Sequence, residues 1–168
     1  EKEGRIHEVY RTADLLMYLI YSYIAGGLLF LYNPFIRVFF GADYLFPMSI
    51  VLIIVMNFYL NGMRQTNLIF REAMGLFWYD RYKSIAEGIV NLIVSVLLVR
   101  RFEVAGIFLG TIVSTLTTSF WVEPYVLMRY GMKKDWKRKL RDYFVRYVGR
   151  TAIAMAVILI SIKICGKI

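Results

Sequence analysis

Four polar side chains recur along one apolar segment of the sequence at helical spacing. Asn57, Asn61 and Arg64 occupy positions i, i+4 and i+7, and Arg71 continues the same line. Residues at these spacings share one face of a helix. A guanidinium group binds phosphate through parallel hydrogen bonds, so this face could line a cavity that binds an anionic group. The pattern therefore indicates non-covalent binding of an anion.

Arg64 has two interpretations. If its helix continues to Arg71, the guanidinium group lies about 10 Å inside the helix end, because an α-helix rises 1.5 Å per residue. A charge at that depth is costly unless it meets water, a partner or a ligand. If the helix instead ends at Met63, the Arg64 side chain snorkels: its methylene groups stay in the apolar region while its guanidinium group reaches the interface. The sequence leaves both interpretations open.

A second polar face is expected on the next helix. Glu87 and Asn91 are four residues apart, and Ser95 extends the same line. These side chains could line the same cavity as the arginine stripe. Alternatively, Glu87 forms an ion pair with Arg64 or Arg71, since charges inside a membrane usually pair.

Two more acidic residues lie at the edges of apolar runs. Glu123 precedes Pro124, and a proline perturbs a helix, so a hinge or a capped kink is expected there. Asp14 lies at the start of the first apolar run. We expect Asp14 to be a solvated helix end.

The elements that position these residues are five apolar runs. The chain is 59% hydrophobic with a mean hydropathy of +0.55, well above an ordinary soluble domain. Each run is about long enough to cross a bilayer, where backbone groups must be satisfied within a helix. We therefore predict an all-α, polytopic transmembrane helix bundle with spans at approximately 13–32, 45–71, 80–99, 104–129 and 148–165.

The basic residues are concentrated on alternate connections between the runs. The net charge is +9, and one dense basic group lies between residues 129 and 150. Basic residues in short loops favour the cytoplasm, which places the N-terminus of this chain inside. The clustering beside apolar spans indicates anionic lipid headgroups rather than nucleic acid as the counter-charge.

The basic segment at 133–146 has its own periodicity. Trp136, Leu140, Phe144 and Tyr147 recur at helical spacing, with Lys and Arg around much of the remaining circumference. This pattern is typical of an amphipathic helix that lies on an anionic leaflet. A basic cytoplasmic linker is the alternative.

A stripe of small residues follows the fourth run. Gly106, Gly110, Ser114 and Thr118 recur every four residues. Small residues at this spacing let two helix backbones approach closely. We expect the stripe to pack against a neighbouring helix, and the short connection at residues 100–103 predicts that the third and fourth spans form a tight antiparallel hairpin.

Several kinds of chemistry have little support in this composition. The chain has one Cys and one His, so no disulfide, zinc site or Ser-His pair is expected. We predict neither a cofactor nor enzymatic activity. Because the sequence opens at Glu1, we also expect it to be a piece of a longer protein.

The order of features resembles the C-terminal half of bacterial polysaccharide flippases of the multidrug/oligosaccharidyl-lipid/polysaccharide transporter superfamily. The resemblance covers nearly the whole chain and rests on the combined series rather than on one motif. Its segments are GADY (41–44), NGMR (61–64), FREAMGLFWYDRYK (70–83), EGIVNL (87–92), GIFLGT (106–111) and EP (123–124).

The resemblance implies one lobe of a two-lobed transporter in the bacterial cytoplasmic (inner) membrane. Such a transporter moves an undecaprenyl-diphosphate-linked oligosaccharide outward for polysaccharide biosynthesis, and the N-terminal lobe would be the missing partner. In this chain Arg64 and Arg71 would contact the diphosphate. Polar glycan would meet Asn57, Asn61, Glu87 and Asn91.

Three other functions remain as alternatives. A drug or cation antiporter of the same superfamily would need a proton- or sodium-binding carboxylate in its cavity. A membrane glycan polymerase or ligase would commonly carry a large external loop, and both predicted external connections are short. A structural module would not need the charged stripe.

Overall fold

The computed structural model describes residues 2–165, and the chain is helical throughout them apart from short connections. Six α-helices are supplemented by short 3₁₀ and π-helical turns. In chain order the elements are α1 (Lys2–Phe39), η1 (Ala42–Tyr44), α2 (Met48–Ala73), η2 (Leu76–Tyr79), α3 (Lys83–Phe102), α4 (Val104–Ser114), η3 (Thr115–Ser119), α5 (Phe120–Val126), η4 (Leu127–Gly131) and α6 (Trp136–Cys165).

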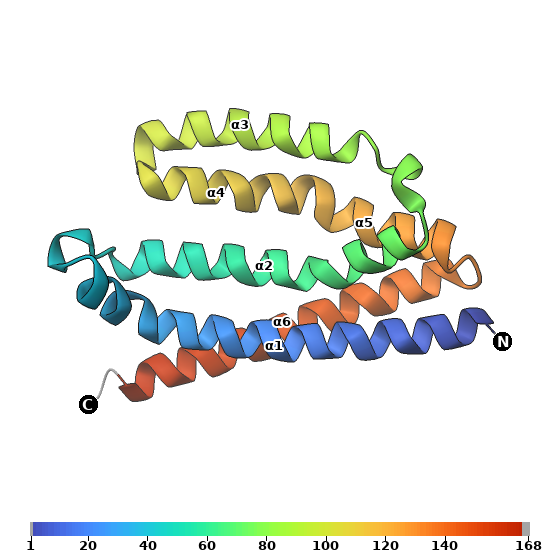
Figure 1. Cartoon of the computed structure of the whole chain (residues 1–168), viewed down its shortest axis with the longest axis horizontal. Helices are drawn as coiled ribbons and strands as arrows, with labels where there is room; N and C mark the ends of the chain where they lie inside the picture. The colour runs from blue at the N-terminus through green and yellow to red at the C-terminus, as the bar shows by residue number, and fades with distance from the viewer. Residues whose placement is uncertain (1, 166–168) are drawn as a thin grey trace.

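The long helices run back and forth along one common direction (Figure 1). α2 is central, since it packs against α1 on one side and against α4 and α5 on the other. α3 pairs with α4 at one edge, and α6 crosses near α1 at the opposite edge. The N-terminus, the α2–α3 connection and the α5–α6 connection therefore lie at the same end of the bundle, as the alternation of basic connections predicts.

α1 is longer than the apolar run at 13–32. It begins before that run and continues past Pro34 to Phe39, where the chain turns at Gly41 with φ 100°. A positive φ of this size favours glycine, which has no Cβ to clash. The expectation that the helix ends near residue 32 is therefore wrong by about two turns, and Asn33 donates a hydrogen bond to the carbonyl oxygen of Phe46 at 3.0 Å.

α2 continues without interruption past Arg64 to Ala73. Gly75 then ends it in the left-handed conformation, with φ 65° and ψ 31°. The helix ending at Met63 is thus excluded, and Arg64 lies well inside a continuous helix.

α3 and α4 form the tight hairpin that the sequence predicts. A Cβ on Gly106 would lie 2.5 Å from the backbone carbon of Leu98, and one on Gly110 would lie 2.0 Å from the Ser95 hydroxyl oxygen. Only glycine permits this approach of the two backbones. The role of the small-residue stripe in helix packing is confirmed at these two positions.

The fourth apolar run forms a helix that is twice widened. The α-helical segments α4 and α5 are joined by the π-helical turn η3, and a second π-helical turn, η4, follows α5. The hydroxyl of Thr117 bonds to the carbonyl oxygen of Val113 at 2.8 Å, and that of Thr118 bonds to the carbonyl oxygen of Ser114 at 2.5 Å. These hydroxyl groups therefore bond back to the preceding turn of their own helix and need no other partner in the interior of the bundle.

α6 corrects the expectation of a separate interfacial helix at 133–146. The basic segment and the following apolar run form one continuous helix from Trp136 to Cys165. Trp136 and Tyr147 contact aromatic residues of α5, so the apolar side of the basic segment packs on protein. The predicted span at 148–165 is therefore the second half of a longer helix.

Two helices in the described part of the chain are long and apolar enough to cross a membrane. They cover Gly4–Phe39 and Val104–Gly131. This suggests that the protein associates with a membrane. α2 and α3 carry polar and charged residues within their apolar runs, and they do not belong to this class.

Candidate functional site

Arg64 lies at the centre of a cluster of four charged side chains from α2, α3 and α5. Its Nε and Nη2 atoms donate to the two carboxylate oxygens of Glu123, at 3.1 and 2.6 Å. This paired geometry is the strongest form of the arginine–carboxylate interaction. Glu123 has only 1% of its surface exposed, so α5 presents its carboxylate to α2 in the interior of the bundle.

Glu87 approaches the same guanidinium group from α3. The Nη1 atom of Arg64 lies 3.0 Å from one carboxylate oxygen of Glu87, and Nη2 lies 3.4 Å from the other. The side chain of Glu87 is 21% exposed, so it forms the accessible edge of the cluster. The predicted ion pair of Glu87 with Arg64 is confirmed.

Lys83 completes the cluster from the first turn of α3. Its ammonium group lies 2.5 Å from Oε1 of Glu123, and its side chain is 5% exposed. Two positive and two negative groups therefore face one another. A buried charge without a partner costs several kcal/mol, and the pairing offsets part of that cost.

The π-helical turn η3 brings hydroxyl groups to the cluster. Thr115 donates to Oε1 of Glu87 at 3.2 Å, and Ser119 donates to Oε2 of Glu87 at 2.6 Å. Thr115, Ser119 and Glu123 are four residues apart, and all three contact side chains of α3. Single π-helical turns inside α-helices occur frequently at functional sites.

The cluster offers charged and hydrogen-bonding groups that could exchange one ionic partner for another. No group of three or more His, Cys, Asp and Glu side chains in the described part of the chain could hold a metal ion. Arg64 is already neutralised, so an incoming anion must displace a carboxylate from it. Glu87 is the more exposed carboxylate, and Thr115 and Ser119 would continue to hold it after displacement.

Two predicted cavity residues on α2 lie beside the cluster, and one of them joins it. Asn61 accepts a hydrogen bond from Arg64 at 3.3 Å and donates one to the carbonyl oxygen of Asn57 at 3.0 Å. Asn57 donates to the carbonyl oxygen of Phe108 at 2.8 Å. Asn57 therefore ties α2 to α4, whereas Asn61 positions the guanidinium group.

Asn91 faces α4. Its amide donates to the hydroxyl of Thr111 at 3.0 Å and to that of Ser114 at 3.3 Å. Its carbonyl oxygen accepts a hydrogen bond from Ser95 at 3.3 Å. Asn91 thus belongs to the α3–α4 interface, one turn from Glu87.

Arg71 has a different partner from Arg64. Its Nη1 atom lies 2.5 Å from Oδ2 of Asp80, and the guanidinium group lies 5.8 Å from the ring centre of Phe77. Both contacts come from the connection between α2 and α3. The structure therefore places Arg71 in the basic end of the bundle, about two turns of α2 away from Arg64.

Sequence reasoning underestimated the acidic partners. Glu123 is expected to mark a hinge or a capped kink, yet it is the most buried member of the cluster, and Lys83 is not among the predicted site residues. The four-residue spacing of Lys83 and Glu87 places them on one face of α3, and this signal could have indicated Lys83. No local spacing indicates Glu123 as their partner. Asp14 is likewise buried and ion-paired with Arg150 of α6, so the expected solvated helix end is wrong.

No protein-family model, curated protein or solved structure matches this chain. The function proposed below therefore rests on the geometry of these residues and on the resemblance described under Sequence analysis.

Proposed function

We propose that this chain is a lobe of a multi-pass transporter that flips a diphosphate-linked oligosaccharide lipid across the bacterial cytoplasmic membrane. The observation that carries the proposal is the buried, charge-balanced cluster around Arg64, at the point where α2, α3 and α5 meet. Charges in the interior of membrane helix bundles are rare, and they mark substrate or ion pathways. The chain needs no catalytic group, since only non-covalent contacts change.

The distribution of polar and apolar side chains supports a bundle embedded in lipid. α3 exposes Leu92, Ile93 and Leu97 over more than half of their surfaces, at 66%, 55% and 65%. The side chains that are buried include Asn67, Ser114, Thr115, Ser119 and Glu123. Water would favour the opposite arrangement, whereas lipid favours apolar side chains on the outer faces of the bundle.

The charge distribution supports an orientation. The N-terminus and the α2–α3 and α5–α6 connections share one end of the bundle (Figure 1), and most of the Lys and Arg residues lie there. In the proposed orientation this end faces the cytoplasm. The cluster then lies inside the cytoplasmic half of the bundle, where a lipid-linked substrate would first enter.

Exchange of partners at Arg64 would couple binding to a change of shape. A diphosphate that replaces Glu87 at the guanidinium group removes a bond between α2 and α3 but leaves the bond between α2 and α5. The π-helical turn beside Ser119 and the proline at Pro124 are points where the fourth run can bend. Such a local rearrangement is the kind of step that alternating access requires.

A cation-coupled antiporter is a second candidate, and the two carboxylates of the cluster favour it. Glu87 and Glu123 could bind a proton or a sodium ion if Arg64 moved away. The two proposals differ in what depends on Arg64. Removal of Arg64 should lower the affinity of an anion-binding site for its substrate, whereas it should raise the affinity of a cation-binding site.

The proposal is tested by replacing Arg64 in the full-length protein and measuring surface polysaccharide together with the amount of protein in the membrane. We expect Arg64→Ala to lower export at least tenfold per molecule of protein, and Arg64→Lys to restore part of it, because lysine keeps the charge but loses the paired geometry. Arg100→Ala, at the exposed end of α3, is the control and should leave export unchanged.

A paired variant separates a role in transport from a role in folding. Arg64→Ala alone leaves Glu87 without its cation, which costs about 3 to 5 kcal/mol for a buried pair and lowers abundance. Arg64→Gln combined with Glu87→Gln removes one charge of each sign and leaves Lys83 paired with Glu123. We expect normal abundance without export. Normal export by this variant would reduce the cluster to a structural ion pair and overturn the proposal.

A further inference from the structure

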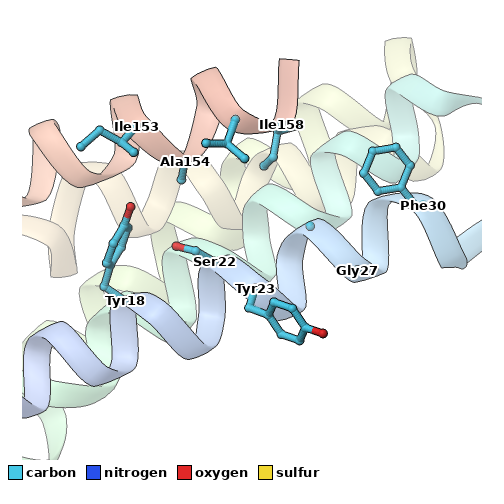
Figure 2. A pocket seen from close by; sticks show the side chains of 10 residues that line it. Tyr18, Ser22, Tyr23, Gly27, Phe30, Ile153, Ala154 and Ile158 are labelled. Atoms are coloured by element: carbon cyan, nitrogen blue, oxygen red, sulfur yellow. The ribbon is translucent and has the colours of Figure 1, made fainter. Parts of the chain in front are cut away.

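A groove runs between α1 and α6 on the side of the bundle opposite to the α3–α4 hairpin. Its volume is about 340 Å³. Figure 2 shows Tyr18 and Ser22 of α1 opposite Ile153, Ala154 and Ile158 of α6. The lining is predominantly apolar, and Gly26 and Gly27 widen the groove on the α1 side because they have no side chains.

A basic stripe on α6 continues this groove toward the basic end of the bundle. Arg146, Arg150, Ala154 and Ile158 are four residues apart and therefore share one face of α6. Arg150 forms an ion pair with Asp14 of α1, and its guanidinium carbon lies 5.5 Å from the ring centre of Tyr18, which lines the groove. Arg150 thus lies at one end of the apolar lining, and Arg146 lies one helical turn further toward the basic end of the bundle.

Among the residues that the structure describes, Arg146 forms no ion pair within 4.0 Å. Its Nε and Nη2 atoms are buried, and they have no hydrogen-bond partner among the residues that the structure describes. Arg150 differs, because it forms a direct ion pair with Asp14, whereas Asp14 acts on Arg146 only over a longer distance. A buried guanidinium group without an acceptor loses the free energy of its hydration, so this site favours an anion beside Arg146.

We propose that the α1–α6 groove binds one bilayer phospholipid with an anionic headgroup. The phosphate lies at Arg146 and Arg150, and one acyl chain lies along the groove against Tyr18, Ala154 and Ile158. This site is separate from the Arg64 cluster. The inference rests on the membrane orientation in the proposed function but not on the transported substrate.

The dimensions agree with a lipid in one leaflet. Twelve residues separate Arg146 from Ile158, and at 1.5 Å per residue they span about 18 Å. Half of a hydrocarbon core of about 30 Å is about 15 Å. A headgroup at the stripe therefore places its acyl chain within a single leaflet. In the proposed orientation this is the cytoplasmic leaflet, where anionic headgroups attract basic residues.

The test uses the full-length protein in nanodiscs that contain equal amounts of phosphatidylglycerol and phosphatidylcholine, followed by native mass spectrometry of retained lipid. We expect one retained lipid, with phosphatidylglycerol preferred at least fivefold. Arg146→Gln should abolish this preference. Arg141→Gln, whose side chain is 76% exposed on another face of α6, is the matched control and should keep it. An equal loss in both variants would indicate a non-specific basic surface and overturn the site.

A second variant tests the acyl-chain part of the groove. Ala154→Phe fills the lining and should lower retention of both lipids, while the melting temperature shows that the protein remains folded. Inorganic phosphate at millimolar concentration should not displace the retained lipid. Displacement by phosphate alone would indicate a simple anion site and contradict the proposal. No readout of this test involves Arg64. A protein that retains lipid but does not transport would therefore contradict the proposed function and leave the lipid site intact.

Discussion

Each arginine of the α2 stripe is paired with a carboxylate from another segment. Arg64 meets Glu87 and Glu123, and Arg71 meets Asp80. The sequence could predict the arginine stripe, because it depends on spacing within one helix. It could not predict that Glu123 is a partner, because that contact joins residues far apart in the chain and depends on how α5 is rotated by the preceding π turn.

Arg71 is expected to act in folding rather than in substrate binding. The side chains of Arg71 and Asp80 are 12% and 3% exposed, so Arg71→Ala leaves a buried carboxylate and should destabilise the protein by about 3 to 5 kcal/mol. Arg71→Gln combined with Asp80→Asn should restore abundance and export. Lost export by this paired variant at normal abundance would instead assign Arg71 to the substrate site.

The helix interfaces depend on small or polar residues at particular positions. The sequence predicts the glycine contacts of α4, because a four-residue repeat of small residues is visible without a structure. It does not predict the continuity of α6, because a change from basic to apolar composition near residue 147 looks like a boundary. Neither proline nor a turn motif interrupts the chain there, and Gly149 alone does not end the helix.

Alanine substitutions at two glycines distinguish the effect of helix packing on stability from the effect of intrinsic helix propensity. Gly106→Ala should destabilise the protein by about 1 to 3 kcal/mol, because its Cβ would overlap the backbone of Leu98. Gly88→Ala, with no atom within 4 Å of the added Cβ, should stabilise it by about 0.5 to 1 kcal/mol. Thermal unfolding of the purified protein measures both, and equal shifts would contradict the close contact in the α3–α4 hairpin.

A buried hydrogen-bonded chain joins three helices near the basic end. Tyr10 of α1 donates to Asn67 of α2 at 2.7 Å, and Asn67 donates to Tyr143 of α6 at 3.0 Å. Asn67→Ala leaves both tyrosine hydroxyls without this partner, and we expect a loss of about 1 to 3 kcal/mol of stability. Thr12→Ala, on the exposed side of α1, should change the melting temperature little. Equal effects would show that the chain of hydrogen bonds contributes nothing special.

Apolar runs and basic connections predict the order and direction of the helices, but they do not predict which helices pack together. The order and direction of the long helices agree with the sequence prediction, because connection length and charge restrict which ends meet (Figure 1). The partners of each helix depend on shape and on buried polar groups. The central position of α2 and the position of α6 beside α1 therefore emerge only from the structure.

The proposed orientation can be measured by cysteine labelling in intact cells. Cys165, the one cysteine of this sequence, is first replaced by Cys165→Ser, together with any cysteine elsewhere in the full-length protein. An impermeant maleimide should then label Asp43→Cys and Glu103→Cys from outside, but label Lys134→Cys only after permeabilisation. The three positions lie in the α1–α2, α3–α4 and α5–α6 connections. Labelling of all three from the same side would contradict a bundle whose helices alternate across the membrane.

The most direct measurement is flipping by the purified full-length protein in liposomes, with a fluorescent polyprenyl-diphosphate oligosaccharide as the probe. The wild-type protein should move the probe between leaflets. The paired variant Arg64→Gln with Glu87→Gln should not, although it reconstitutes to the same density. Equal flipping by both proteins would contradict a role for the Arg64 cluster, and no flipping by the wild-type protein would contradict the proposed transport itself.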